Sequence, residues 1–424
     1  MNHHSTAVAD PSTAGPSGTA MPGRRLRPPT RSTLLTPQFL ALALATLAYF
    51  TADGILIAAV PRFVAGPLGA GNIAVGLVVG AFSVSAFFLR PWAGRLGDRR
   101  GRRPLMVVGA GVFAVSVLGY VTASDPAVLA ALRLLTGAGE AFFFVGALTA
   151  FTDVAPPDRR GEAMSLASLS LYVGIGVGPL LGELAIDRAG FTAAWLLAAV
   201  CALAALAAAL RTPETRPALP AASAGDEPAG HRLVHPAGVL PGLVLLASIL
   251  GMAGFLAFVP LYALDLGMTG SSGVLLVFAG VVVGIRGVGA RIPDRLGAAR
   301  ATRLALGLSA IGLATAGSWQ SPTGLFAGAI VLGVGIALLT PSVFTLAVER
   351  VAPQERAAVM GTTSAFLDLA FGLGPAGLGV VAASVGRPGT FVAGAVVAAA
   401  GLVLVVAARL GRPPRPHRAA TSHR

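Results

Sequence analysis

Charged residues and cysteine are both scarce in this chain. Asp, Glu, Lys and Arg together make up 12% of its 424 residues, about half the share that is usual in a soluble domain. Hydrophobic residues make up 55%, which is more apolar surface than a soluble fold of this length can hide in its interior. The single cysteine, Cys201, excludes a disulfide bond within the chain. We therefore expect an integral membrane protein.

The long apolar stretches lack histidine. The six histidines lie in polar segments near the ends and in the middle of the chain, at His3, His4, His231, His235, His417 and His423. No histidine is then available within the membrane for a metal site, a proton relay or a catalytic triad, so we expect no metal cofactor and no enzymatic activity. The sequence also resembles no phosphate-binding P-loop. This argues against ATP-driven pumping and favours an ion gradient as the energy source.

Apolar stretches recur along the chain, each long enough for a helix to cross about 30 Å of hydrocarbon. The predicted spans are residues 37–61, 73–93, 104–123, 127–150, 162–186, 192–210, 238–262, 272–292, 302–319, 323–346, 357–384 and 389–409. The expected fold class is therefore all-α, with twelve transmembrane helices. Residues 1–36 are predicted to be a disordered arm, and residues 410–424 a tail.

The placement of the basic residues, all 31 of which are arginine, predicts the orientation. Most of them lie in the arm, the tail and the loops that join even to odd spans, whereas the opposite loops hold Arg62, Arg188 and Arg387. Positive residues gather on the cytoplasmic side, so both termini are expected there. Because the arginines fall between apolar runs, we expect no nucleic-acid partner. The Ala-, Gly- and Arg-rich composition indicates a bacterial inner membrane.

The two halves of the chain resemble each other. Five residues at and after the end of the second span recur around the end of the eighth at a constant shift of 196 positions: Arg90, Arg95, Asp98, Arg99 and Gly101 match Arg286, Arg291, Asp294, Arg295 and Gly297. Gly178-Pro179 matches Gly374-Pro375 at the same shift. We expect six-helix bundles at 37–210 and 238–409, related by a pseudo-twofold axis and joined by a cytoplasmic linker, residues 211–237. Parallel repeats with a pathway between them are a transporter architecture.

The segment Gly94–Arg103, after the second span, reads GRLGDRRGRR. It matches every defining position of motif A of the major facilitator superfamily, G-x-L-a-D-R-x-G-R-K/R, and the chain resembles that family over residues 37–409. The resemblance implies a loop that latches the two halves together at the cytoplasmic gate. Its residues are Gly94, Asp98, Arg99, Gly101, Arg102 and Arg103, with a second-half copy at Asp294, Arg295 and Gly297. The alternative is a solvated, topology-setting loop.

Two further segments resemble motifs of the same family. Arg133–Ala141 is similar to motif B, with Thr136 in place of the usual Gln. The fifth span is similar to motif C of the drug–proton antiporters, through Gly174, Gly178, Pro179 and Gly182, but Glu183 replaces the last Gly. The second resemblance implies export. The alternative interpretation is that these glycines only permit close helix packing.

Three carboxylates and one arginine lie deep in the spans, where ionisable groups are costly and suggest function. Asp53 and Arg133 are predicted at similar depths, roughly 12 and 9 Å from the outer end, and are expected to approach each other. Glu140 lies roughly 20 Å down, with no arginine of the first, fourth, seventh or tenth span predicted beside it, and is the first candidate proton site, ahead of Asp53. The alternative is that Glu140 is structural and is tied to a hydroxyl or to Arg90. The third carboxylate, Asp368, fits a structural role as well as a coupling role.

These features favour a proton-coupled exporter of small amphipathic organic molecules or drugs, with lipid, protons and substrate as partners, and a monomer. Glu140 or Asp53 would be the counter-charge for a cationic substrate. The cavity wall is predicted to be aromatic, from Phe50, Phe142, Phe143, Phe144, Phe255, Phe258 and Tyr262, with part of the run 142–144 facing lipid. The alternatives are an uptake symporter for a sugar or other metabolite, which the scarcity of asparagine disfavours, and an intramembrane enzyme.

Overall fold

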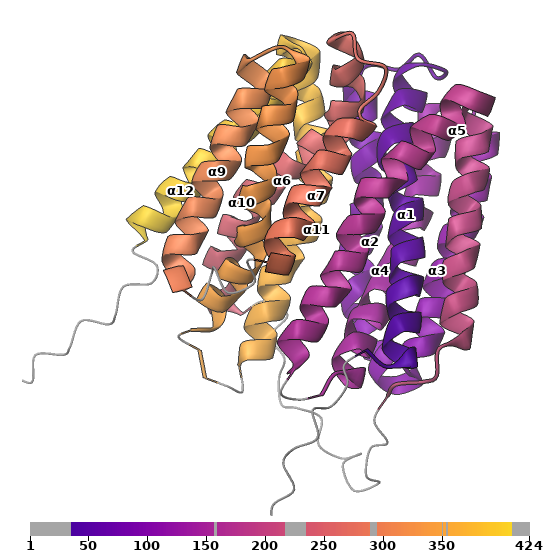
Figure 1. Cartoon of the computed structure of the whole chain (residues 1–424), viewed down its shortest axis with the longest axis vertical. Coiled ribbons are helices and arrows are strands. Elements are labelled where there is room, and N and C mark those ends of the chain that lie inside the picture. Colours follow the sequence, from indigo (N-terminus) through magenta and orange to yellow (C-terminus); the bar gives the residue numbers. More distant parts are fainter. Residues whose placement is uncertain are drawn as a thin grey trace, which may run out of the picture. The chain divides into compact units, whose positions relative to one another are not determined.

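The computed structural model describes residues 35–156, 159–216, 235–288, 295–349, 351–352 and 355–408. These residues contain helices and no strand, which confirms the all-α prediction. The elements are α1 (Pro37–Ala65), α2 (Asn72–Arg100), α3 (Arg102–Gly119), η1 (Tyr120–Thr122), α4 (Pro126–Val154), α5 (Arg160–Arg211), α6 (Pro236–Asp265), α7 (Ser272–Val288), α9 (Ala298–Ser318), α10 (Pro322–Val348), α11 (Arg356–Val385) and α12 (Arg387–Ala407) (Figure 1).

Every predicted span coincides with a helix or with part of one. The fifth and sixth spans both lie in α5, where Ala189 and Gly190 leave helical geometry and break the helix. Nine helices in the described part of the chain are long and apolar enough to cross a membrane when α5 is counted once, and α7 is a shorter apolar helix. The chain is therefore a multi-pass membrane protein, while the number of twelve crossings stays a prediction. The arm, the tail and residues 217–234 of the linker lie outside the described residues.

Short polar caps followed by proline start three of the helices. Thr36 Oγ1 accepts a hydrogen bond from the Phe39 N–H at 3.1 Å, and Ser321 Oγ accepts one from the Gly324 N–H at 3.1 Å. Asp125 Oδ1 accepts from two backbone N–H groups of α4. Each cap satisfies donors that the first helical turn leaves unpaired, and proline is favoured at the position that follows. These caps fix where α1, α4 and α10 begin.

The motif C-like glycines pack α5 closely against α1. A Cβ added to Gly174 would lie 2.7 Å from the Phe50 backbone, and one added to Gly178 would lie 2.5 Å from the Thr51 carbonyl oxygen. Gly182 faces α1 in the same way, and Pro179 lies inside α5. Small residues let helix backbones approach in lipid. The segment therefore acts as a packing surface within the first half of the chain.

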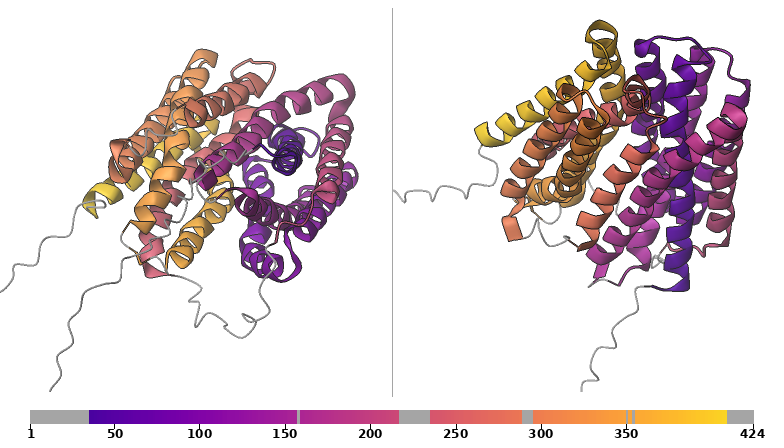
Figure 2. Two further views of the ribbon diagram at one scale, coloured as in Figure 1. Left: turned by 60° about the horizontal axis from the view of Figure 1, so that its bottom comes forward. Right: turned by 45° about the horizontal axis from the view of Figure 1, so that its top comes forward.

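The two halves meet through α2 with α11 and through α5 with α7. A Cβ on Gly372 would lie 2.9 Å from Ser83 Oγ, and a Cβ on Gly176 would lie 2.6 Å from the Ala279 Cβ. Ser83 and Ala279, like Gly176 and Gly372, are separated by the repeat shift of 196 positions. The two contacts are thus related by the internal repeat. Helices of the first half, indigo to magenta-pink, and of the second half, salmon red to yellow, gather in separate groups (Figure 2).

We name the two ends of the helices by the connections found there. The linker face is the end where α1 begins, where α2 and α4 end and where residues 211–216 lie. The far face is the end where α1 ends and where α2, α7 and α12 begin.

Candidate functional site

Arg90 joins two carboxylates in the interior of the helices. Its Nη2 lies 2.8 Å from Glu140 Oε1 and 3.0 Å from Asp368 Oδ1. The three side chains are largely buried, with 20%, 14% and 5% of their surface exposed for Arg90, Glu140 and Asp368. Arg90 and Glu140 belong to α2 and α4 of the first half, whereas Asp368 belongs to α11 of the second. This ion triad therefore ties the two halves together.

The arginine beside Glu140 comes from the second span. Helix α2 continues to Arg100 instead of stopping near residue 93, so Arg90 lies well inside the helix and reaches Glu140. Arg90 consequently does not extend to the lipid headgroups. The alternative prediction, that Arg90 ties Glu140, describes the geometry found, and Asp368 completes the pair from across the interface.

The triad is not saturated with hydrogen bonds. Glu140 Oε2 and Arg90 Nε are buried and have no hydrogen-bond partner among the described residues. The Arg90 guanidinium also lies over the Phe144 ring, 4.7 Å from its centroid. Unpaired buried polar atoms are costly unless they serve a purpose. Glu140 thus keeps an acceptor, and Arg90 a donor, that no described residue uses.

Asp53 and Arg133 lie within electrostatic range of each other, and Asp53 is also within range of Glu140. No direct ion pair joins Asp53 to Arg133 among the ion pairs of the described ranges. Arg133 is 5% exposed. Its Nη2 donates to the Val79 carbonyl at 3.2 Å, and its guanidinium lies 4.7 Å from the Phe82 centroid. The motif B arginine is thus held inside the first half.

Thr136, which replaces the motif B glutamine, also faces the interior of the first half. Its Oγ1 lies 2.5 Å from the Tyr120 hydroxyl and 3.1 Å from Ser116 Oγ. Five of the aromatic residues predicted to line a cavity are buried in the packing core instead, namely Phe50, Phe143, Phe255, Phe258 and Tyr262. Phe142 is buried too, at 8% exposure, so it does not face lipid. Phe144 is the predicted aromatic residue that contacts the triad.

The motif A loop binds its own half and the start of the linker. Arg102 pairs with Asp98 at 2.9 Å and with Asp153 at 3.1 Å. The Glu214 carboxylate accepts hydrogen bonds from the backbone N–H groups of Arg102 and Arg103 at 2.8 and 3.2 Å. The Asp98 side chain remains 74% exposed, and no contact with the second half is among those of the described residues. In this conformation the loop anchors the linker.

Gly101 makes the Glu214 contact possible. Its φ of +103° lies in a region that side-chain-bearing residues rarely adopt, and an added Cβ would lie 2.3 Å from Glu214 Oε2. The other motif A residues lie close by. Arg99 accepts a hydrogen bond from Arg216 through its carbonyl, Arg103 donates to the Leu210 carbonyl at 2.6 Å, and Gly94 has open space around it.

The second-half copy of the motif is described only in part. Gly297 directly precedes α9 and has a φ of +76°, as Gly101 precedes α3 with a positive φ. Arg295 is exposed, and Asp294 lies outside the described residues. The glycine of the motif thus has the same conformational role in both halves.

We expect Glu214→Gln to loosen the linker anchor. Burial raises the pKa of Glu214, but the four backbone N–H groups of Arg102, Arg216, Arg103 and Thr215 outweigh burial and lower the pKa below its ordinary value. Such a carboxylate stabilises the folded contact above its ordinary pKa, and the contribution is lost as pH falls through the lowered value. Because the side chain is exposed, the loss is about 1 kcal/mol, or about fivefold faster exchange.

The measurement is amide hydrogen exchange at Arg102 and Arg103, compared between the wild type and the variant at each pH. The difference in exchange rate between the two proteins should have its largest value at pH 7. It should vanish only below the ordinary pKa of a glutamate. Glu349→Gln, at an exposed glutamate where α10 ends, is the matched control. Equal exchange of these two amides in the wild type and in Glu214→Gln would contradict the anchor.

On the far face, Glu183 of α5 caps the start of α7. Its Oε1 accepts from the Ser271 N–H and Oγ at 2.7 and 2.8 Å, and its Oε2 accepts from the Ser272 N–H at 2.9 Å. Glu183 is 5% exposed, and a Cβ on Gly270 would lie 2.3 Å from its Oε2. In the sequence, Glu183 is recognisable only as a departure from motif C. The carboxylate in fact joins the first half to the second.

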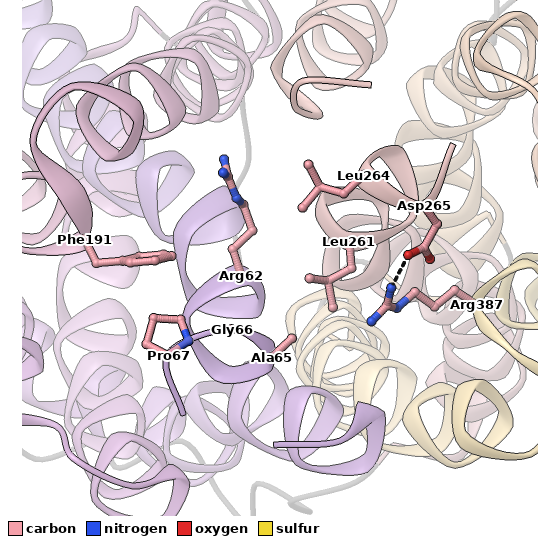
Figure 3. Close-up of a pocket in the computed structure, with 9 residues that line it drawn as sticks. All are labelled: Arg62, Ala65, Gly66, Pro67, Phe191, Leu261, Leu264, Asp265 and Arg387. Carbon is pink, nitrogen blue, oxygen red and sulfur yellow. Dashed lines mark hydrogen bonds and ion pairs between the residues drawn. The ribbon is translucent and has the colours of Figure 1, made fainter. Parts of the chain in front are cut away.

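Charged side chains surround a pocket beside this contact (Figure 3). Arg387 pairs with Asp265 at 2.5 Å, and Arg62 lies 3.7 Å from Asp187 and 4.0 Å from Glu183. Figure 3 shows Arg62 on the α1 side of the pocket and Leu264, Asp265 and Arg387 on the opposite side. Nearby, Asn72 of α2 donates to the Ala382 carbonyl of α11 at 3.1 Å. Polar contacts between the halves are thus concentrated toward the far face.

Comparison with known proteins identifies the family. A model described as Major Facilitator Superfamily matches residues 42–317 and 287–424. The uncharacterized MFS-type transporter YhhS of Escherichia coli strain K12 is 26% identical over 405 residues, which cover 94% of this chain and 98% of that protein. An uncharacterized MFS-type transporter of Pseudomonas aeruginosa strain LESB58 is 29% identical over 385 residues, covering 88% and 93%.

Solved structures share the fold at low sequence identity. The human organic anion transporter MFSD10 matches with a TM-score of 0.65 and 21% identity. The match covers 87% of this chain and 100% of the MFSD10 chain. A bacterial homolog of the human lysosomal transporter Spinster, in an inward-facing and occupied conformation, matches with a TM-score of 0.71 and 15% identity over 89% of this chain and 98% of that one. The chain therefore belongs to the major facilitator superfamily and is a membrane transporter of that type.

Proposed function

We propose that this transporter is a proton-coupled exporter of small amphipathic organic molecules, an antiporter that works by alternating access and without enzymatic activity. The observation that carries the proposal is the ion triad, in which two carboxylates from different halves share the guanidinium of Arg90. When both carboxylates are ionised, the triad has one negative charge in excess, and a single proton neutralises it. The proton belongs to the pair of carboxylates and not to either residue alone.

The triad offers a way to couple a proton to movement of the halves. If the proton resides on Asp368, Arg90 keeps its partner Glu140 within the first half, and the tie to α11 weakens. If the proton resides on Glu140, Arg90 is held more strongly by Asp368. A ligand shifts a conformational equilibrium only through its different affinity for the two states. Proton occupancy of this interface contact provides such a difference.

The contacts between the halves support a conformation open toward the linker face. Gly76 approaches Pro375, Asn72 binds Ala382 and Glu183 binds Ser271, all toward the far face. At the linker face, Asp98 binds only residues of its own half among the described contacts. With the linker face in the cytoplasm, as the arginine distribution indicates, this is an inward-open state of a monomer in the bacterial inner membrane. The motif C-like packing of α5 on α1, next to Asp53, favours export over uptake.

The test is transport in proteoliposomes with an imposed pH gradient. Purified protein is reconstituted with a pH-sensitive dye inside, and a panel of amphipathic fluorescent compounds is added. We expect some compounds to move against the direction of proton flow, and a protonophore should stop this movement. Movement in the same direction as the protons would replace the exporter by the uptake symporter. Compound fluxes that are independent of the pH gradient would overturn proton coupling itself.

A further inference from the structure

Arg286 and Tyr172 meet across the interface of the two halves. The guanidinium carbon of Arg286, in α7, lies 4.8 Å from the centroid of the Tyr172 ring, in α5. In the internal repeat, Arg286 corresponds to Arg90 and Tyr172 corresponds to Asp368, each at the shift of 196 positions. The contact is therefore the second-half counterpart of the Arg90–Asp368 ion pair.

The two counterparts differ in their charge. Arg90 has two carboxylates, whereas the positions that correspond to Asp368 and Glu140 are Tyr172 and the buried, apolar Ile336. Arg286 forms no ion pair with any residue that the structure describes, and its Nε is buried without a hydrogen-bond partner there. The interface thus repeats the arginine but not the acids that neutralise it.

Arg286 is partly buried and lies in the last turn of α7, where a guanidinium without an anion is costly in the membrane. Arg286 lies fourteen residues after the start of α7 at Ser272, roughly 21 Å along the helix axis. Ionisable groups inside the membrane face a cavity or a partner and mark functional sites. The cation–π contact with the ring stabilises the guanidinium, but by less than an unpaired charge in the membrane costs. The Tyr172 ring alone therefore does not account for the arginine.

The other two arginines in helix interiors already have acidic neighbours. Arg90 is bound by the triad, and Arg133 is packed in the first half within range of Asp53. Glu140, which a cationic substrate would need as its counter-charge, is already paired with Arg90. Arg133 has Asp53 within electrostatic range, although no ion pair joins them, whereas no carboxylate pairs with Arg286 among the described residues.

We propose that Arg286 binds the carboxylate of an anionic amphipathic substrate, which takes the place that Asp368 occupies beside Arg90. A carboxylate fits because a planar guanidinium donates two parallel N–H groups to its two oxygens. The Tyr172 ring contributes an apolar face for the body of the same molecule. The inference rests on the proposed transport function and names its substrate class.

The test measures binding and not transport, on the purified full-length protein in detergent. Thermal unfolding is followed with matched compounds that share an apolar body: 4-phenylbutyrate, its methyl ester and 4-phenylbutylamine, and the same three forms built on indole-3-butyrate and octanoate. A ligand that binds only the folded state raises the unfolding temperature. We expect at least one carboxylate to raise it, and its ester and amine to have little effect.

Four variants locate the effect. Arg286→Gln should weaken the protective carboxylate at least about tenfold, the factor for about 1.4 kcal/mol, and Tyr172→Phe should keep the protection. Tyr172→Asp should abolish it, because the new carboxylate reproduces the Arg90–Asp368 pair and occupies Arg286. Tyr172→Asp should fold at least as well as the wild type. It therefore tests whether carboxylate protection depends on Arg286 even if Arg286→Gln is unstable. Arg303→Gln, at the exposed Arg303 of α9, is the control.

The proposal is wrong if no carboxylate protects better than its ester, or if Arg286→Gln or Tyr172→Asp, once folded, leaves the protection unchanged. Carboxylate protection without a response to a pH gradient in proteoliposomes would overturn the proposed proton coupling and leave this site in place. Proton-coupled movement of esters or amines, with no protection by carboxylates, would overturn this inference alone.

Discussion

Glu140→Gln should strongly slow proton-driven transport while substrate exchange across the membrane continues. Glutamine keeps the shape of the side chain and an acceptor for Arg90, but it cannot take up a proton. The positive charge of Arg90 is then balanced by Asp368 alone. The variant therefore holds the triad permanently in the neutral state that protonation gives the wild type. Exchange of labelled for unlabelled substrate needs no net proton movement, so it should persist.

Asp368→Asn should have the same transport phenotype with a different structural consequence. The variant also holds the triad in its neutral form, but it removes the acid that joins Arg90 to the second half. We expect the pH-gradient-driven rate to fall about 5- to 150-fold in both variants, the range given by a coupling free energy of about 1–3 kcal/mol. Only Asp368→Asn should also loosen the contact between α2 and α11, seen as faster amide exchange there.

The measurement is uphill transport and equilibrium exchange in the same proteoliposomes. Asp125→Asn is the matched control, because Asp125 caps α4 far from the triad and asparagine caps helices as well as aspartate does. Loss of both activities in Glu140→Gln would mean that the triad is a structural tie. Uphill transport retained in both variants would remove it from proton coupling.

The fold could be predicted from the sequence because lipid imposes simple requirements on it. A spanning helix needs about twenty apolar residues, and its polar ends are marked by caps such as Thr36-Pro37 and Ser321-Pro322. Each predicted span accordingly falls on a helical segment. The break in α5 at Ala189 and Gly190 also agrees with the predicted boundary between residues 186 and 192.

The pairing of Arg90 with Glu140 was predicted only as an alternative, for two physical reasons. A span predicted from hydropathy ends where charged residues begin. The second span was therefore predicted to end near residue 93, although the helix continues to Arg100. The rotation of a helix about its axis is set by packing against its neighbours, and the apolar run does not reveal it. The similar depth of the two residues could be predicted from the sequence. Arg90 lies eighteen residues from the far-face end of α2, and Glu140 lies fourteen residues from the far-face end of α4.

The cap that Glu183 provides could not be found from local patterns. Helix caps are normally recognised within three or four residues of the helix start, whereas Glu183 lies 88 residues from Ser271 in the sequence. The resemblance to motif C drew attention to what the position lacks, a glycine, and not to what a carboxylate there can do. The contact of Arg286 with Tyr172, by contrast, can be predicted from the repeat shift once Asp368 is known to bind Arg90.

Glu183→Gln should shift the transporter toward a conformation open at the far face. The carboxylate accepts three hydrogen bonds at the positive start of α7, where a negative charge is stabilised by the helix dipole. An amide has one oxygen acceptor and no charge. Hydrogen bonds to charged groups contribute about 1.5–3 kcal/mol each, so we expect a loss of about 2 kcal/mol, or about a 30-fold change in the ratio of closed to open molecules.

Distances between spin labels on the far face report this ratio directly. Labels at Thr122 and Ala383, both exposed and one in each half, should show a longer distance population in Glu183→Gln, in a background where Cys201 is replaced by serine. Asp187→Asn is the matched control, since Asp187 lies one turn along α5 and faces the same Arg62, but is 57% exposed and belongs to a surface pair of little energetic weight. If both variants give the wild-type distances, the cap does not hold the far face closed. If both open it equally, the charge around Arg62, and not the start of α7, closes this end of the interface.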